Sequence, residues 1–484
     1  MRRLSGTDTL MLYAENARAQ NIIAPVAVYD ASSAPGGRVT LTDVLRFVES
    51  RLHVSESFRE KLVRVPFGLG NPYWVRDPDF DLEYHVRHIA LPRPGTWEQF
   101  AAQVSRIGQR PLDLDRPPWE LYVIEGLDAV EGVPPGGFAM LLKMHHAAVD
   151  GIAGLQVLNA LHDHTPDPGP PEVPADDWRP DPRPSDLELV GRAAAHAVVD
   201  PVGTVRRLLW PTLRAAPRGT MRAVRSPEAR GQTLAPVTAT RFNRPVGPHR
   251  VWDARRFLLE EAKQIKRAVP GASINDVALA WIGGALRAYL GEHGELPESS
   301  LVALMPISLR ATTTQQHGGT EVAASRGGNR FAMANIPMGT DVEDPLERVA
   351  AVQARTQTAK EYALDAPSLV EWSEALPGAL AGTAQRAVIR LANRTGRTMG
   401  VHMIVTNVPG PRNPLYFDGA RCLFTSGMAP VVDGMGIIHA VTSYQEQFVA
   451  CFTADRDMMP DPAFYSACLD EAFGDLKKSA GTAR

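Results

Sequence analysis

Two adjacent histidines are the residues of this 484-residue chain whose types and spacing most clearly suggest chemistry. His145 and His146 end the apolar run GFAMLLKMHH, and Asp150 and Gly151 follow within the next five residues. The pKa of an unperturbed imidazole is about 6.5, so a histidine that faces a cleft at the end of a strand can act as a general base at neutral pH. The pattern therefore suggests acid–base catalysis at this position.

A metal site is the first alternative to a catalytic base. In a strand, side chains alternate between the two faces, which predicts that His145 and His146 point in opposite directions. Two such residues do not reach one zinc ion without distortion, and the sequence places no third ligand beside them. The second alternative is a buried structural histidine followed by an ordinary helix cap, and the residues alone leave it open.

Asp150 and Gly151 stand where a helix begins. The following segment, GIAGLQVLNALHDH, repeats apolar residues at helical spacing, which predicts that Asp150 is the N-cap. A glycine next to the cap lets the backbone pass close to whatever lies above His146. The aspartate can thus shape the turn without contacting a substrate.

The sequence offers no recognisable nucleophile of its own. It lacks a GxSxG elbow, a P-loop and a GxGxxG loop, so a base at this site would activate an external nucleophile. A second polar pair, Asn275 and Asp276, lies at the start of the segment SINDVALAWIGGALRAYL, whose spacing from Ser273 predicts a capped helix.

The elements that must position these residues predict an α/β fold with two lobes. Strand-like and helix-like segments alternate over the first 160 residues, and strand-like segments return after residue 300. Between the lobes, residues 165–184 contain eight prolines, too many for a helix or a central strand, and an arginine-rich stretch follows. We therefore expect lobes at 1–164 and 245–484, joined by a connection at 165–244.

Composition limits the partners and the compartment. A hydrophobic fraction of 44% and a net charge of −3 indicate a soluble protein and give no general attraction to nucleic acid. The three cysteines form no CxxC pair, which favours a reducing compartment over a disulfide framework or a thiolate zinc site. The first residues lack the apolar stretch of a secretory signal, and no run is long enough to span a bilayer.

Contact with a membrane surface is nevertheless expected at residues 203–230. This stretch has seven arginines against the single acid Glu228, and Leu208, Leu209 and Trp210 supply apolar anchors. The alternative is a solvated basic connection.

The motifs resemble those of a known family. HHAAVDG resembles the HHxxxDG motif of the CoA-dependent acyltransferase superfamily, which includes chloramphenicol acetyltransferase and the condensation domains of peptide synthetases. Four further segments are similar to the bacterial wax ester synthase/diacylglycerol acyltransferase family, and the resemblance covers nearly the whole chain. They are PLDLDRPPWELYVIEGL (111–127), SINDVALA (273–280), MPISLR (305–310) and TNVPGP (406–411).

The resemblance implies roles for individual residues. His146 would be the catalytic base, Asp150 a mainly structural residue, and His145 a support for the loop. Asn275 and Asp276 match the family's Asn-Asp pair near the active site. The sequence departs from the family at QNIIAPVAVYD, where a Met-His pair usually precedes the first strand, and this leaves the acyl and alcohol pockets undefined.

The resemblance further implies two chloramphenicol-acetyltransferase-like lobes with an active-site tunnel between them. The expected activity is acyl transfer from acyl-CoA to diacylglycerol or a long-chain alcohol, with no cofactor, at the inner face of the plasma membrane or at lipid droplets in the cytoplasm. Two alternatives remain: a condensation or polyketide-tailoring enzyme that uses a carrier protein, and a catalytically silent lipid-binding protein. The sequence does not indicate acyl length, preferred acceptor or oligomeric state.

Overall fold

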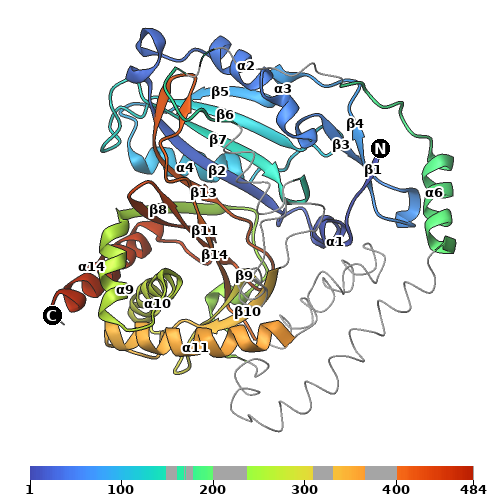
Figure 1. Ribbon diagram of the computed structural model, residues 1–484. Helices are drawn as coiled ribbons and strands as arrows, with labels where there is room; N and C mark the ends of the chain where they lie inside the picture. The colour runs from blue at the N-terminus through green and yellow to red at the C-terminus, as the bar shows by residue number, and fades with distance from the viewer. Residues whose placement is uncertain are drawn as a thin grey trace, which may run out of the picture.

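The computed structural model describes residues 1–148, 161–167, 169, 178–199, 237–308, 331–365 and 400–482. Two mixed sheets, each covered by helices, form the two lobes (Figure 1). This confirms the predicted mixed α/β class. Among the described helices, none has the length and apolarity needed to cross a bilayer.

The first sheet has the strand order β12-β13-β2-β7-β6-β5. Its neighbours pair antiparallel except β5 and β6, which are parallel. Helix α2 (Leu41–Glu49) packs on one face and α4 (Trp97–Gly108) on the other. The strands are β2 (Ile22–Asp30), β5 (Val86–Ala90), β6 (Trp119–Glu125), β7 (Phe138–His145), β12 (Tyr416–Phe417) and β13 (Ala420–Met428).

Two strands of this first sheet come from the second half of the chain. β13 pairs antiparallel with β2 from Arg421 opposite Asp30 to Met428 opposite Ala24, and β12 pairs with β13 at the edge. The sequence-based range 245–484 includes both strands, so that range does not coincide with one sheet. This exchange joins the two lobes through backbone hydrogen bonds.

A small sheet flanks the first lobe. Its order is β1-β4-β3, with β1 (Arg2–Arg3), β3 (Glu60–Val63) and β4 (Tyr73–Arg76). Helix α1 (Gly6–Ala14) follows β1, the short helix α3 (Leu82–His85) precedes β5, and α6 (Asp186–Val199) packs beside the small sheet. The hydroxyl of Ser185 accepts a hydrogen bond from the N–H of Glu188 at 3.2 Å, as its spacing from Glu188 predicts.

The second sheet has the order β10-β9-β11-β14-β15-β8. Four helices gather on one side of it (Figure 1) and bury an apolar core that includes Trp281. The strands are β8 (Arg250–Leu258), β9 (Val302–Ser308), β10 (Phe331–Pro337), β11 (Met403–Pro409), β14 (Ile437–Tyr444) and β15 (Gln447–Asp455). The helices are α9 (Leu259–Ala268), α10 (Ile274–Glu292), α11 (Pro345–Asp365) and α14 (Pro462–Thr482).

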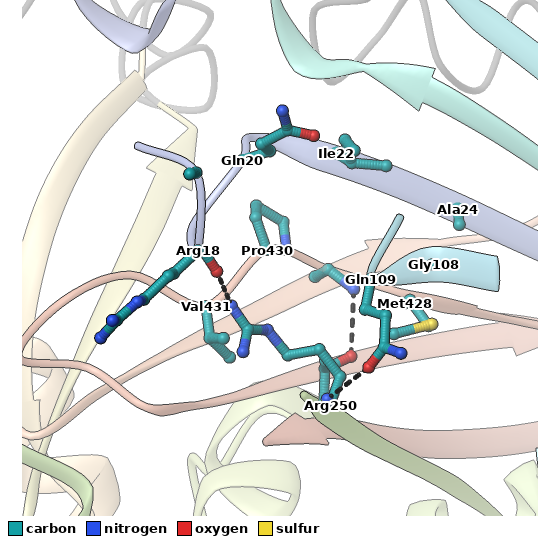
Figure 2. A pocket seen from close by; sticks show the side chains of 13 residues that line it. Arg18, Gln20, Ile22, Ala24, Gly108, Gln109, Arg250, Met428, Pro430 and Val431 are labelled. Carbon is teal, nitrogen blue, oxygen red and sulfur yellow. Dashed lines mark hydrogen bonds between the residues drawn. The ribbon is translucent and has the colours of Figure 1, made fainter. Parts of the chain in front are cut away.

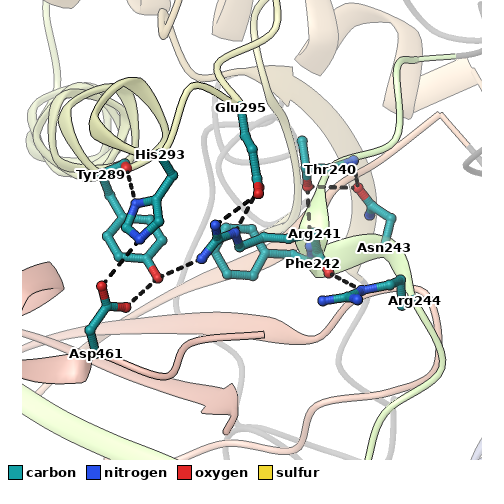
Figure 3. A network of polar contacts seen from close by, with 9 residues as sticks. All are labelled: Thr240, Arg241, Phe242, Asn243, Arg244, Tyr289, His293, Glu295 and Asp461. Carbon is teal, nitrogen blue, oxygen red and sulfur yellow. Dashed lines mark hydrogen bonds and ion pairs between the residues drawn. The ribbon is translucent and has the colours of Figure 1, made fainter. Parts of the chain in front are cut away.

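Polar contacts fix the chain where it enters the second lobe (Figure 3). The Arg241 guanidinium donates to both carboxylate oxygens of Glu295, at 2.7 and 2.8 Å, and to the hydroxyl of Tyr289 at 3.0 Å. That hydroxyl in turn donates to Asp461 at 2.5 Å. The end of the connection is thereby tied to the C-terminal end of α10 and to the start of α14.

A buried histidine lies in the second lobe with both ring nitrogens hydrogen-bonded. Nδ1 of His402 accepts the N–H of Val302 at 2.9 Å, and Nε2 donates to the carbonyl of Thr238 at 2.9 Å. His402 is 1% exposed, and burial lowers its pKa to about 4.

We therefore expect stability to fall as the pH drops from 6.5 toward 4, because the unfolded chain binds this proton first. The loss from His402 is about 3 kcal/mol of unfolding free energy. Melting temperatures of the wild type, His402→Gln and the exposed-site control His164→Gln at pH 7.5 and 5.0 test this. His402→Gln should be less stable at pH 7.5 and lose less on acidification, and parallel losses in all three would contradict the assignment.

Candidate active site

The strand that carries the histidines is buried on both faces. Phe138, Met140, Leu142 and Met144 of β7 pack into the core on the α2 side, whereas Ala139 and Leu141 pack into the core on the α4 side. The alternation predicted from the sequence is confirmed over this strand.

The strand ends one residue earlier than the sequence pattern suggests. His145 is its last residue, and His146 opens a single 3₁₀ turn, His146–Ala148. The reason is that the N–H of Ala147 donates to Nδ1 of His145, at 3.1 Å, and not to a neighbouring strand. The prediction that both histidines are strand residues is therefore wrong for His146.

His145 is fixed by two hydrogen bonds. Its Nε2 lies 2.7 Å from Oε1 of Glu15, and its Nδ1 accepts from the backbone of Ala147. Since a backbone N–H can only donate, Nδ1 carries the lone pair and Nε2 carries the proton. The side chains of His145 and Glu15 are 2% and 9% exposed, so this contact is shielded from solvent. Both ring nitrogens of His145 are therefore engaged in contacts with the protein, and the supporting role that the resemblance implies for this residue stays a prediction.

Glu15 is a residue of the site that the sequence analysis missed. It is the C-cap of α1, and its Oε1 also accepts the N–H of Asn21 at 2.6 Å. The carbonyl of Asn21 then accepts the N–H of His146 at 2.7 Å. One carboxylate therefore positions the side chain of His145 and, through Asn21, the backbone of His146. The available signal was an acid within the mostly apolar segment TLMLYAEN.

The turn that begins at His146 contacts residues of the first lobe. The hydroxyl of Ser57 donates to the carbonyl of Ala148 at 2.8 Å. Ala148 and Leu114 pack against a small apolar cluster formed by Leu4, Leu12, Leu62 and Trp74. His146 itself is partly buried. Asp150 and Gly151 lie outside the described residues, so their predicted roles stay predictions.

The segment PLDLDRPPWE braces β7. The carbonyl of Pro118 accepts the N–H of His145 at 3.0 Å. Trp119 donates from Nε1 to the carbonyl of Phe58 at 2.9 Å and stacks on the imidazole of His85, with ring centroids 4.5 Å apart. These contacts show that Trp119 packs within the first lobe.

A buried ion pair also links this segment to β7. Lys143 Nζ lies 3.3 Å from Glu120 Oε2, and the Lys143 side chain is fully buried. Burial lowers the pKa of Lys143, while Glu120 opposes that shift by favouring the charged amine.

The Asn-Asp pair lies at the N-terminus of α10. Oδ2 of Asp276 accepts from the backbone N–H and from the hydroxyl of Ser273, both at 2.7 Å, which completes a capping box. Asn275 accepts a hydrogen bond from the side-chain amide of Asn407 on β11. The structure thus joins the SINDVALA and TNVPGP motifs within the second lobe. These contacts give Asp276 the capping role predicted from its position.

A small cavity lies between the lobes near Ile22, the residue paired with His145 in the β2–β7 ladder (Figure 2). Arg250 closes it by donating to the carbonyl of Arg18, while the amide oxygen of Gln109 accepts the N–H of Arg250 at 3.0 Å. The cavity volume is about 30 Å³. That is roughly the space of one water molecule, which is too small for a substrate.

Comparison with known families agrees with the motifs. The family model described as "Wax ester synthase/diacylglycerol acyltransferase catalytic domain" matches residues 4–278, and the model described as "WS/DGAT C-terminal domain" matches residues 327–477. A Mycobacterium tuberculosis protein, named as a candidate diacylglycerol O-acyltransferase, is 33% identical over 467 residues, 94% of this chain and 92% of its own. A similarly named Mycobacterium bovis protein is 29% identical and covers 98% of each chain. The chain belongs to the wax ester synthase/diacylglycerol acyltransferase family.

Solved structures support the fold. A wax ester synthase/diacylglycerol acyltransferase from Marinobacter aquaeolei superposes with a TM-score of 0.67 at 22% identity, covering 99% of this chain and all of the other. The trichothecene 15-O-acetyltransferase of Fusarium sporotrichioides gives a TM-score of 0.57 at 10% identity, covering 98% and 94%. At these identities the likeness establishes a shared architecture. The expected tunnel between the lobes stays a prediction.

We expect Glu15→Ala to lower kcat about tenfold with little change in KM, because the buried N–H groups of His145 and Asn21 lose their acceptor. Leaving such donors unpaired costs about 1–3 kcal/mol. Glu15→Gln keeps an acceptor oxygen and should retain most of the activity. Steady-state kinetics beside the exposed-site control Glu131→Ala test this. Equal kcat in Glu15→Ala and the control would show that Glu15 does not position the site.

Proposed function

We propose that this member of the family transfers a fatty acyl group from acyl-CoA to the hydroxyl of diacylglycerol or a long-chain alcohol, with His146 as the general base. The observation that carries the assignment is the arrangement around Glu15. Both ring nitrogens of His145 are engaged in structural contacts. This supports His146, and not His145, as the general base. Family membership supplies the substrate classes.

The mechanism is direct transfer in one active site. His146 accepts the hydroxyl proton as the alcohol oxygen attacks the thioester carbonyl carbon. The tetrahedral intermediate collapses, the carbon–sulfur bond breaks, and protonated His146 returns the proton to the CoA thiolate. The ester and free CoA leave. No cofactor beyond the acyl donor takes part in this scheme.

The cysteines are poor candidates for a covalent intermediate. Cys422, Cys451 and Cys468 are all buried. Burial raises the pKa of Cys422 to about 12 and that of Cys468 to about 11, and it also raises that of Cys451. The thiolate is the reactive form of cysteine, and a raised pKa keeps these side chains as protonated thiols.

Product analysis with labelled palmitoyl-CoA tests the proposed reaction. The donor is offered separately with diacylglycerol and with hexadecanol, without any carrier protein, and the lipid products are resolved. Labelled triacylglycerol or wax ester supports the proposal. Transfer that requires an acyl carrier protein would contradict it and favour the condensation-type alternative.

Substituting each histidine in turn distinguishes the catalytic role of His146 from the structural role of His145. His146→Ala should lower kcat by about 10²- to 10⁴-fold with the fold retained, the usual contribution of a positioned base. His145→Ala should lower the melting temperature and cost a smaller part of the rate, since its contacts with Glu15 and Ala147 are structural. Asp150→Asn should keep most of the activity, because asparagine also caps helices. Thermal melting and single-turnover transfer measure both effects, and an active His146→Ala beside an inactive His145→Ala would reverse the assignment.

We also propose attachment to the inner membrane surface or to lipid droplets through residues 203–230, which lie outside the described part of the chain. The support is the sequence of seven arginines beside Leu208, Leu209 and Trp210. Replacing Arg206, Arg207 and Arg214 by Gln should weaken binding to anionic liposomes by about tenfold or more, since each basic residue near such a surface contributes about 1 kcal/mol. Unchanged binding in sedimentation with the vesicles would count against this location.

A further inference from the structure

A bulky aromatic side chain projects into solvent from a turn of the small sheet. Phe67, in the 3₁₀ turn Pro66–Gly68 between β3 and β4, is 94% exposed, and Leu69 beside it is 58% exposed. The φ angle of Phe67 is +59°, in the left-handed region that favours glycine and asparagine. A phenylalanine therefore stands where both the backbone conformation and the contact with water disfavour it. Such a residue points to a function outside the folded core.

The base of this turn is packed against α6. The carbonyl of Val65 accepts the N–H of Gly68 at 3.1 Å, and Val65 lies in an apolar cluster with Leu189 and Ala193 of the helix. The backbone at Gly70 approaches α6 so closely that a Cβ there would lie 3.1 Å from the Cβ of Ala193. The exposed tip thus projects from a packed base.

Two arginines lie at the same end of the small sheet as this tip. Arg64 directly precedes Val65, and Arg3 of β1 is opposite Tyr73, the first residue of β4. Both arginines are exposed, and neither forms an ion pair with an acid in the part of the chain that the structure describes. The exposed apolar side chains are therefore accompanied by positive charge.

The same edge of the first lobe leads to the arginine-rich stretch. Figure 1 shows α6 at the outer edge of the lobe, and Leu187 on this helix is 82% exposed. α6 ends at Val199, and the stretch 203–230 follows it in the sequence with seven arginines. Exposed apolar side chains beside positive charge are typical of segments that lie in the interface of an anionic membrane.

The shape of the tip favours a lipid layer over a protein partner. Because Phe67 is almost fully exposed, it forms a protrusion and not the wall of a groove. A stable protein partner would need a fitted pocket and about 800 Å² of contact on each side. Fluid lipid closes around a single ring without such a pocket, and aromatic side chains are enriched at membrane–water interfaces.

We propose that Phe67 and Leu69 insert into the surface of a bilayer that contains anionic phospholipids, with Arg3 and Arg64 against the phosphate groups. The inference extends the proposed membrane attachment with residues outside 203–230, so the two contacts can fail separately. Moving a side chain of this size from water into an apolar layer changes an equilibrium by about ten- to a hundredfold. Loss of the ring should therefore be measurable as weaker binding to vesicles.

Asparagine at position 67 provides the test. Phe67→Asn removes the ring, and asparagine tolerates the left-handed backbone, so the melting temperature should stay the same or rise. Co-sedimentation with vesicles of phosphatidylcholine and phosphatidylglycerol should weaken by about tenfold or more, whereas Phe67→Trp should bind like the wild type. The matched control is Leu258→Asn, since Leu258 is 55% exposed in the second lobe, and it should also bind like the wild type. Equal binding of Phe67→Asn and the wild type would overturn the proposal, as would a wild type that does not bind these vesicles.

Salt separates this contact from the arginine-rich stretch. At about 0.5 M NaCl the attraction between exposed charges is largely screened. The loss caused by Arg206→Gln, Arg207→Gln and Arg214→Gln together should therefore shrink, while the loss caused by Phe67→Asn should persist. If the triple variant binds normally at low salt and Phe67→Asn does not, attachment through 203–230 fails and the present inference stands. The reverse result would overturn the present inference alone.

A fluorescent label reports the insertion directly. The three native cysteines are buried, so the dye NBD attaches selectively to Leu69→Cys and to the control Leu258→Cys. On addition of vesicles, the fluorescence of the label at position 69 should rise and be quenched by lipids brominated in the acyl chain, and the label at position 258 should not respond. An unchanged signal at position 69 would refute insertion. None of these measurements needs turnover, so they hold whether or not the proposed acyl transfer is found.

Light scattering without lipid checks for a contact between copies of the chain. The wild type and Phe67→Asn should have the same molar mass in solution. A lower mass for Phe67→Asn would show that the turn joins copies of the protein and would overturn the proposal.

Discussion

The contact between the carboxylate of Glu15 and the imidazole of His145 is the constraint on which the candidate site depends. It spans 130 residues of sequence and is buried, so it fixes the end of α1 against the end of β7. The same oxygen holds Asn21, whose carbonyl holds the backbone of His146. Removing that carboxylate would leave buried N–H donors without partners, which costs free energy of folding. The geometry of the proposed base is thus set by a residue that need not touch the substrate.

Other contacts hold the residues around Glu15 and His145 in a fixed position relative to the second lobe. β13 crosses from the second half of the chain to pair with β2, and Trp252 of β8 donates to the carbonyl of Gly427 on β13 at 2.9 Å. Trp97 of α4 donates to Asp253 of the second lobe at 2.6 Å. Asn21 directly precedes β2, so the pairing of β13 with β2 holds the strand that follows Asn21. The pairing of α10 with β11 through Asn275 and Asn407 organises the opposite lobe.

Local patterns predicted much of this architecture. The apolar alternation before His145 identified β7, and the Ser273–Asp276 spacing identified the start of α10, whereas the lobe bounds drawn at the proline-rich stretch stay a prediction. Periodicity could not show that His146 leaves the strand. The N–H of Ala147 donates to Nδ1 of the His145 side chain and not to a neighbouring strand, and a pattern of apolar residues does not reveal such a contact. Nor could it pair residues 420–428 with 24–30, or Glu15 with His145, because such contacts join positions far apart in sequence. The motif resemblance singled out both histidines and did not single out Glu15.

The central claim is that one base catalyses direct transfer from acyl-CoA to the alcohol, and the most direct test is the mass of the intact protein during the first turnover. The wild type is mixed rapidly with acyl-CoA in the absence of any alcohol and quenched in acid at millisecond intervals. The mass of the intact protein is then measured by mass spectrometry. The account predicts that the protein keeps its unmodified mass and that ester forms only when alcohol is added. A stoichiometric acyl adduct that forms faster than turnover and disappears on addition of alcohol would contradict it.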